Sequence, residues 1–283
     1  MIRILAILIL LFLAGCSGHG RFSLRERNDA LVPHELTDKH FSQGLRLEYT
    51  DNDRTYGVGQ QIRTPDDISI ATPQPDEPPW SGWLYADAAQ HKIEERYKQT
   101  QRVTIGIIGP NSFAEDVQTW FHEDICDCTT PEGWDLQLRQ EVTAMYTWTR
   151  EVRDYEKQIW GLEFDNTSRW GINAGTPYTN VNYGTSVRLG HRLRSFKNET
   201  TPFSYFGTLG VNAKVAFWDT FLDGSTFRSS PSVEREYFVA DITAGVHVES
   251  HGWEIGYDYV VRTQEFDEQE NHKFGSITLA KSF

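Results

Sequence analysis

The chain has 283 residues, enough for one large β domain or two small domains. Its 27 basic and 40 acidic residues give a net charge of −13, which argues against a nucleic-acid partner because phosphate backbones attract clustered Lys and Arg. The 9 Trp, 12 Tyr and 16 Phe residues are typical of either a large core or the aromatic girdle of a membrane barrel.

The first residues have the form of an export signal. The apolar run 4–13 is too short to span a bilayer but has the length of a signal-peptide core, so we expect residues 1–15 to be removed. Residues 13–16 resemble a bacterial lipobox, which predicts a lipid on Cys16; ordinary cleavage without lipidation is the alternative. No later segment has the pattern of a transmembrane helix, so the mature chain is expected to be exported and either soluble or a barrel.

Residues 51–79 have a weaker pattern and contain several prolines, which preclude a continuous central strand. We interpret them as a long hairpin end or an extracellular loop. Asp66 and Asp67 are interpreted as turn residues within it. Trp80 and Trp83, which follow, are interpreted as rim or girdle aromatics rather than walls of an acyl pocket.

One helix is predicted, over residues 112–122. Ser112 and Glu115 have the spacing of a capping box at its start. Apolar residues follow at helical spacing, and we expect Phe113 and Phe121 to pack this helix onto the rest of the protein.

Gln118 and His122 lie four residues apart, so they share one face of that helix. Spacing alone favours a structural role for His122, as a satisfied or solvent-facing helix histidine. Cys126 and Cys128 follow, and they are either a small disulfide formed in an oxidising compartment or idle thiols. Two thiols alone make a poor zinc site.

From residue 140 onward, apolar and polar residues alternate with period two, which predicts strands with one apolar face. The clearest runs are 142–148, 203–217, 238–248 and 253–261. Polar turn clusters separate these runs. A soluble sandwich and an outer-membrane barrel both show such alternation.

The length of the strands favours the barrel, because sandwich strands usually have only ~3–10 residues. The chain also ends in a predicted strand, 274–283, whose last residue is aromatic. This end resembles the C-terminal signal of outer-membrane barrels, so we expect the barrel assembly machinery to be a partner during biogenesis.

Five blocks of sequence carry a family resemblance. They are Asn28-Asp29, residues 38–44, residues 64–67 with 79–84, residues 107–118 with His122, and residues 262–266 with 274–276. In this order and spacing they resemble the bacterial outer-membrane lipid A deacylases, which remove 3′-O-linked acyl chains. The resemblance implies an all-β fold: one transmembrane antiparallel β-barrel of about twelve strands over residues 21–283, with a short helix near an active site at the outer rim.

The resemblance also implies an ester hydrolysis that depends on Ca²⁺. Asn28 and Asp29 match the Asn-Asp pair of the family, His122 matches its catalytic histidine, and Ser42 stands where the family usually has Thr. His122, Asn28 and Ser42 are therefore the expected catalytic residues, and Asp29, Asn28 and Ser42 the expected metal ligands. His122 would take a proton from water, and Ca²⁺ would polarise the ester carbonyl.

The implied partners are lipid A, as part of lipopolysaccharide, and the lipids of the outer membrane. Gln118 and Lys39 are the residues expected to contact the substrate. The chain has no Gly-x-Ser-x-Gly elbow, which argues against a serine esterase. Two alternatives stay open: a barrel lipoprotein that binds or transports without catalysis, and a phospholipase or esterase that acts on other membrane lipids.

Overall fold

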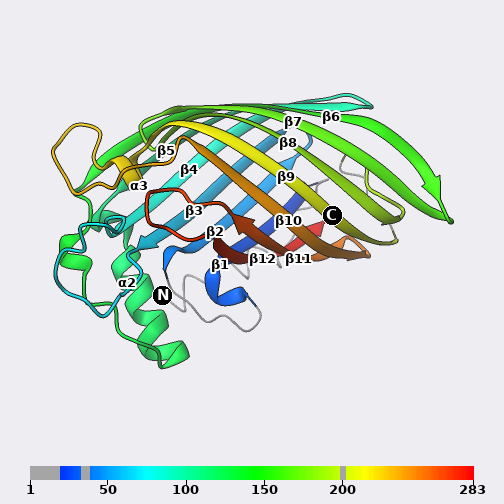
Figure 1. Cartoon of the computed structure of the whole chain (residues 1–283). Helices are drawn as coiled ribbons and strands as arrows, with labels where there is room; N and C mark the ends of the chain where they lie inside the picture. Colours follow the sequence, from blue (N-terminus) through cyan, green and yellow to red (C-terminus); the bar gives the residue numbers. More distant parts are fainter. Residues whose placement is uncertain (1–19, 33–38, 198–201) are drawn as a thin grey trace.

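The computed structural model describes residues 20–32, 39–197 and 202–283 (Figure 1). These residues form a closed antiparallel barrel of twelve strands, in which each strand pairs with the next along the chain and β12 pairs with β1. The predicted all-β barrel is confirmed. The expected signal peptide 1–15, the lipobox residue Cys16 and residue Asp38 lie outside the described residues.

The strands are β1 (Gly20–Asn28), β2 (His40–Asp51), β3 (Arg54–Thr64), β4 (Ser81–Ile93), β5 (Tyr97–Ile108), β6 (Glu141–Ile159), β7 (Leu162–Gly175), β8 (Tyr178–His191), β9 (Phe203–Asp219), β10 (Phe238–Ser250), β11 (Trp253–Arg262) and β12 (His272–Ser282). The helices are α2 (Ala114–Phe121) and α3 (Thr220–Asp223), with short helical turns η1 (Asp29–Leu31), η2 (Pro110–Ser112), η3 (His122–Cys126) and η4 (Trp134–Leu136). None of the described helices has the length and apolar composition needed to cross a bilayer.

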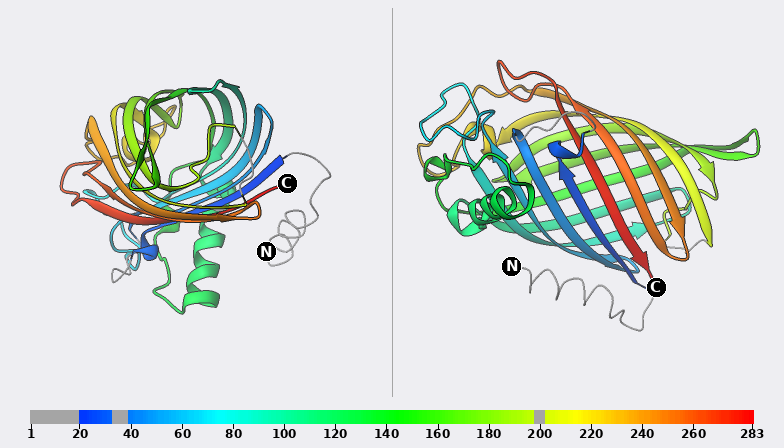
Figure 2. Two further views of the ribbon diagram at one scale, coloured as in Figure 1. Left: turned by 90° about the vertical axis from the view of Figure 1, so that its right-hand side faces the viewer. Right: turned by 90° about the horizontal axis from the view of Figure 1, so that it is seen from below.

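The two ends of the barrel differ in the length of their connections. At one end, Asn52 and Asp53 alone join β2 to β3, whereas segments 65–80, 109–140 and 220–237 extend from the other end. Short periplasmic turns and long extracellular loops are the pattern of outer-membrane barrels, so we assign the long-loop end to the cell exterior. Helix α2 belongs to this end and lies outside the barrel wall (Figures 1 and 2).

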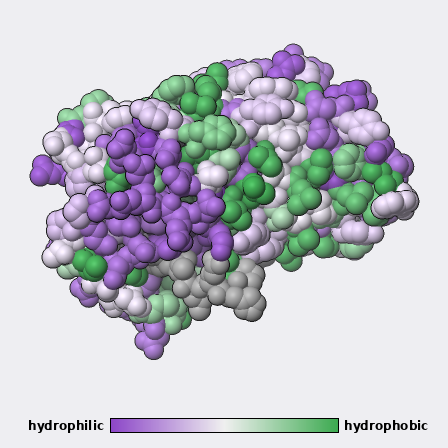
Figure 3. Space-filling view, in the orientation of Figure 1, coloured by the Kyte–Doolittle hydropathy of each residue, from purple (hydrophilic) through white to green (hydrophobic). Residues whose placement is uncertain are grey.

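The barrel wall is apolar on its outer side. Exposed apolar side chains recur along the strands and include Val103, Ile105, Val142, Leu209, Val211, Ile242, Val246 and Ile255. Apolar residues gather along the barrel wall, and hydrophilic residues cover much of the loop end (Figure 3). This arrangement matches a lipid-facing belt, because lipid rather than a second sheet would cover the apolar faces.

The lumen contains ion pairs between residues of different strands. Arg46 binds Asp87 at 2.7 Å, and Arg102 binds the same carboxylate, whose side chain is fully buried. On β6 to β8, Arg153 and Arg188 both contact Asp165, at 3.4 and 2.5 Å. Each of these buried charges therefore has an opposite charge beside it. A buried charge without such a partner would cost free energy.

An apolar core lies under the long loops rather than within the barrel wall. The ring of Trp80 packs on that of Trp134 with centroids 5.1 Å apart, and Trp83 packs against Phe221 and Leu138. Trp80 and Trp83 lie at the rim, at the start of β4, but as girdle aromatics they were wrongly interpreted, because segment 109–140 folds back over this end and buries both indoles.

The interpretation of residues 51–79 as a hairpin end or loop is wrong for its first half, since Arg54–Thr64 is strand β3. Gly57 weakens the alternation that would have indicated a strand. A Cβ at this position would meet Arg46 at 2.7 Å and Asp87 at 2.9 Å, so the glycine leaves room for the ion pair. The prolines all lie beyond the strand, in residues 65–80.

The helix is confirmed, but its predicted cap and packing are wrong. Residue Phe113, with φ of 58°, precedes α2, and Ser112 belongs to the turn η2. Phe113 and Phe121 are 55% and 40% exposed, and the small Ala114 packs on the barrel instead. The start of α2 can lie this close to β4 only because the residues between them are small. A Cβ at Gly82 of β4 would meet both Ala114 and Ser112 at 2.2 Å.

The loop between β11 and β12 contains a buried carboxylate, Glu265, that binds Lys214 at 3.1 Å and both Arg63 and Arg262 at 3.4 Å. Burial alone would raise the pKa of Glu265, but these three cations hold its pKa well below the usual range. The carboxylate therefore neutralises a cluster of cations where β3, β9 and β11 meet the loops.

We predict that Glu265→Gln destabilises the barrel by about 3–5 kcal/mol, because it leaves buried cations without their counter-charge. Thermal unfolding in detergent, followed by circular dichroism, measures the effect. Glu270→Gln is the matched control, since Glu270 is exposed in the same loop. Equal stability of the two variants would contradict this role for Glu265.

Candidate functional site

A cavity of about 1020 Å³ lies between the outer wall of β1–β3 and the segment that contains α2 and η3. Its lining includes Glu26, Asn28, Lys39, Ser42, Gln43, Ile62, Asp66, Gln118, Phe121, His122, Cys126, Cys128 and Thr129. Because α2 lies outside the barrel, the cavity is on the membrane side of the wall, at the loop end (Figure 1). We call it the wall cavity.

Asn28 and Asp29 form the turn with which β1 ends. The Asn28 side-chain oxygen accepts a hydrogen bond from the Ala30 N–H at 2.8 Å and so caps η1. The fully buried Asp29 carboxylate accepts from the backbone N–H groups of Ala30, at 2.9 Å, and Lys39, at 2.8 Å. This turn therefore presents the amide of Asn28 to the wall cavity, with the carboxylate of Asp29 directly behind it.

Ser42 enters the wall cavity from a β-bulge. The register between β2 and β3 shifts between Phe41 and Gln43, which leaves Ser42 as the extra residue. The Ser42 hydroxyl lies 2.8 Å from the hydroxyl of Thr64, and both groups are buried. The bulge thus turns a hydroxyl toward the same cavity that Asn28 lines.

Lys39 and Asp66 of the next loop form an ion pair in the lining of the wall cavity. The Lys39 ammonium lies 3.1 Å from the Asp66 carboxylate. Asp67 accepts hydrogen bonds from the backbone N–H and the hydroxyl of Ser69, at 2.9 and 2.6 Å, which confirms it as a turn residue. Asp66 and Asp67 both line the cavity.

Gln118 and His122 share a buried face, as their spacing predicts. Gln118 is on α2, and its side-chain oxygen accepts a hydrogen bond from the indole N–H of Trp134 at 3.0 Å. This bond connects the helix to the core under the loops, which also contains Trp80. The wall cavity is therefore bounded by a helix that is fixed at one end.

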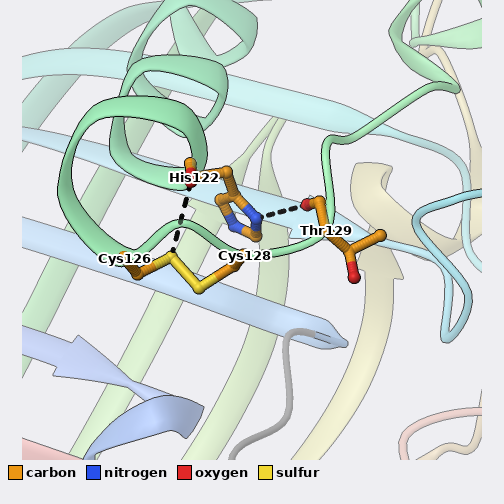
Figure 4. Close-up of a disulfide and its surroundings, with 4 residues drawn as sticks. All are labelled: His122, Cys126, Cys128 and Thr129. Atoms are coloured by element: carbon orange, nitrogen blue, oxygen red, sulfur yellow. Dashed lines mark hydrogen bonds between the residues drawn. A yellow bond between two sulfur atoms is a disulfide. The ribbon is translucent and has the colours of Figure 1, made fainter.

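His122 is 6% exposed and begins the turn η3. Its Nδ1 lies 2.6 Å from the Thr129 carbonyl oxygen, which can only accept, so Nδ1 carries a proton. In the neutral ring, Nε2 is then the basic nitrogen. The solvent-facing position is wrong, because the loop after η3 folds back over the imidazole and satisfies its hydrogen bond (Figure 4).

That loop is closed by a disulfide between Cys126 and Cys128, which confirms one of the two alternatives for these cysteines. The Cys128 N–H also donates to the His122 carbonyl at 2.9 Å. Asp127, between the cysteines, has φ of 52° and turns the chain back toward His122. The disulfide therefore belongs to the short loop that places the Thr129 carbonyl.

The structure brings together five of the six expected site residues around the wall cavity: Asn28, Lys39, Ser42, Gln118 and His122. The sixth, Asp29, lies behind Asn28 and does not line the cavity. Glu26 was missed, although alternation along β1 places it on the same face as Asn28. No signal in the sequence indicates the contribution of Thr129, because its backbone carbonyl makes the contact.

An apolar outer wall, a charged lumen and a cavity on the outer wall define an outer-membrane β-barrel with an extracellular-end site. The family model described as outer membrane protein LpxR matches residues 3–283. The chain therefore belongs to this family of outer-membrane proteins, the lipid A deacylases that its sequence resembles.

Two solved structures are similar to this chain, and the first of them has the same fold. LpxR from Salmonella typhimurium has a TM-score of 0.82 and 16% identity, over 93% of this chain and 100% of that one. The β domain of the Bordetella autotransporter BrkA has a TM-score of 0.47 and 10% identity, over 93% and 98%. No curated protein sequence matches the chain.

We predict that Trp134→Phe lowers the stability of the loop end by about 1–3 kcal/mol, because the buried Gln118 oxygen loses the indole donor while the ring packing is retained. Hydrogen exchange of residues 114–122, measured by mass spectrometry, should become faster. Trp160→Phe is the control, since Trp160 is 96% exposed in the β6–β7 turn. Unchanged exchange in Trp134→Phe would contradict the anchoring role.

Proposed function

We propose that this protein is a Ca²⁺-dependent hydrolase that removes the 3′-O-linked acyl chain from lipid A of lipopolysaccharide. Its membership of the LpxR family supports lipid A deacylation in the outer membrane. The Ca²⁺ requirement and the 3′-O position are the finer parts of the proposal.

One observation supports the proposal most strongly: the residues that match the family's catalytic motifs converge on one cavity, on the lipid-facing side of the wall. Asn28 and Ser42 come from the wall, and Gln118 and His122 from the helical segment outside it. An acyl ester of a membrane lipid can reach such a site without leaving the leaflet. A site in the lumen would require the acyl chains to cross a charged interior.

His122 is the proposed general base. Its Nδ1–H is held by the Thr129 carbonyl, so Nε2 is available in the neutral ring to take a proton from an attacking water. Burial and the hydrogen bond to the Thr129 carbonyl hold the imidazole in one orientation. The base is then already positioned for proton transfer when water and substrate bind. Gln118, one turn earlier on the same face, would orient the substrate or the water.

The donor set at the opposite side fits a hard cation. Asn28, Ser42 and Glu26 offer an amide, a hydroxyl and a carboxylate oxygen to the wall cavity, and Asp29 follows Asn28 directly. Within the described chain, one carboxylate oxygen of Glu26 is buried without a hydrogen-bond partner. Oxygen ligands of this kind suit Ca²⁺, which when bound would polarise the ester carbonyl.

Lys39, at the mouth of the wall cavity, is the proposed contact for a phosphate of lipid A. In the structure its ammonium pairs with Asp66, and about a third of the side chain is exposed, at 34%. A phosphate could compete with Asp66 for the same ammonium. The pairing would then orient the headgroup while the acyl chains remain in the membrane.

We predict that His122→Ala lowers the rate of deacylation by about 10²–10⁴-fold, because the base that accepts the proton of water is lost. Purified protein, lipopolysaccharide and Ca²⁺ are incubated, and the lipid A product is analysed by tandem mass spectrometry, which also identifies the position of the lost chain. His251→Asn is the control, since His251 is exposed in the turn at the opposite end.

Absence of any acyl loss with wild-type protein would contradict the proposed function. Loss from another position would contradict its 3′-O specificity alone. A panel of phospholipids in the same assay distinguishes a lipid A deacylase from a phospholipase, because the phospholipase would hydrolyse the phospholipids with the same base and cation.

A chelator should abolish activity, and added Ca²⁺ should restore it. We predict that Asp29→Asn raises the Ca²⁺ concentration for half-maximal activity by about tenfold or more, because the charge of the ligand set falls. Asp135→Asn, at an exposed position of the loop, should leave this concentration unchanged. Full activity of wild-type protein in excess chelator would contradict the Ca²⁺ requirement.

A further inference from the structure

The disulfide in the wall cavity lies beside the proposed base. One ring nitrogen of His122 and the two sulfur atoms of Cys126 and Cys128 all lie within 4.8 Å of one another. Figure 4 shows the imidazole and the disulfide side by side on one short loop. In the described part of the chain, no other group of three His, Cys, Asp or Glu side chains is arranged so that it could hold a metal ion.

We propose that reduction of this disulfide creates a site for a thiophilic divalent cation, with Zn²⁺ as the expected ion and His122, Cys126 and Cys128 as ligands. The consequence for catalysis rests on the proposed function, since a metal on His122 would occupy the base. The site itself does not depend on that function.

The donors match zinc and not calcium. Thiolate sulfur and imidazole nitrogen are the usual ligands of Zn²⁺, whereas Ca²⁺ takes oxygen. Zn²⁺ is bound at about 2.0–2.3 Å from N and S ligands, so donor atoms a few ångströms apart can converge on one ion after small movements. Two thiols alone make a poor zinc site, and the structure supplies the third ligand by folding the loop back on His122.

The orientation of the imidazole also favours a metal ligand. A histidine that binds a metal through one nitrogen commonly donates its other N–H to a backbone carbonyl, which fixes the ring. The Nδ1–H of His122 already has this partner in Thr129, at 2.6 Å, so Nε2 is the nitrogen that the ring would offer. The wall cavity leaves space for a water molecule as the fourth ligand.

The chemistry requires a two-electron reductant such as a dithiol. The S–S bond breaks, each sulfur gains one electron and one proton, and the dithiol closes to its own disulfide. Cys128 is exposed and Cys126 is half-buried, so a dithiol can reach the bond from the wall cavity. On metal binding the two thiols lose their protons, which leave to solvent.

The test compares oxidised and dithiol-reduced wild-type protein in detergent, freed of reductant without oxygen. Zn²⁺ is titrated against a chromophoric chelator, and Co²⁺ is used as a spectroscopic probe because bound thiolates give it intense charge-transfer absorption. The reduced protein should bind one Zn²⁺ per chain and show this absorption, and the oxidised protein should show neither.

Two variants assign the ligands. In reduced His122→Ala, the affinity for Zn²⁺ should fall by about tenfold or more, because only the two thiolates remain. The Cys126→Ser, Cys128→Ser double variant should lose the charge-transfer absorption; should it fail to fold, the oxidised wild-type protein serves as the control with both sulfurs blocked. Equal Zn²⁺ binding by oxidised and reduced protein, or by reduced wild type and His122→Ala, would overturn the proposal.

These measurements use no lipid, so they distinguish failure of the metal site from failure of the proposed function. Reduced protein that binds Zn²⁺ and still hydrolyses lipid A at the rate of the oxidised protein would retain the site and contradict only its consequence for catalysis.

Discussion

The closure of the barrel between β1 and β12 is the constraint on which the rest of the structure depends. Within a bilayer, backbone N–H and C=O groups have no water to bind, so the first and last strands must pair with each other. This pairing fixes β1 between β12 and β2, with Asn28 opposite both Gly275 and Gln43. The turn that carries Asn28 and Asp29 therefore has a defined position at the extracellular end of the wall.

A second consequence of closure is that the barrel has two separate surfaces, the lumen and the outer wall, with different roles. The lumen is crossed by ion pairs such as Arg46 with Asp87 and Arg188 with Asp165, which stabilise the barrel from within. The candidate site lies instead on the outer wall, where α2 covers β3 and β4 through Ala114 and Gly82. A lipid substrate that approaches from the leaflet would meet this side first, which agrees with the proposed active site outside the barrel.

The fold was largely predictable from the sequence, and the site only in part. Alternation indicates β9 to β12 because their outer residues are large and apolar, but it fails at β3, where Gly57 makes room for an ion pair in the lumen. The resemblance to a family identified Asn28, Ser42 and His122, which the fold brings together. Neither pattern nor resemblance indicates the Thr129 carbonyl that orients His122, because any residue supplies such a group and only the path of the loop brings it there.

We propose that lipid A is hydrolysed on the outer wall, between the Asn28–Asp29 turn and His122. The most direct measurement is a crystal structure of His122→Ala with Ca²⁺ and intact lipid A. We expect a cation beside Asp29 and the ester group of the bound lipid in the wall cavity, between this turn and position 122. Lipid A bound in the lumen, or a cation held away from Asn28 and Asp29, would contradict it.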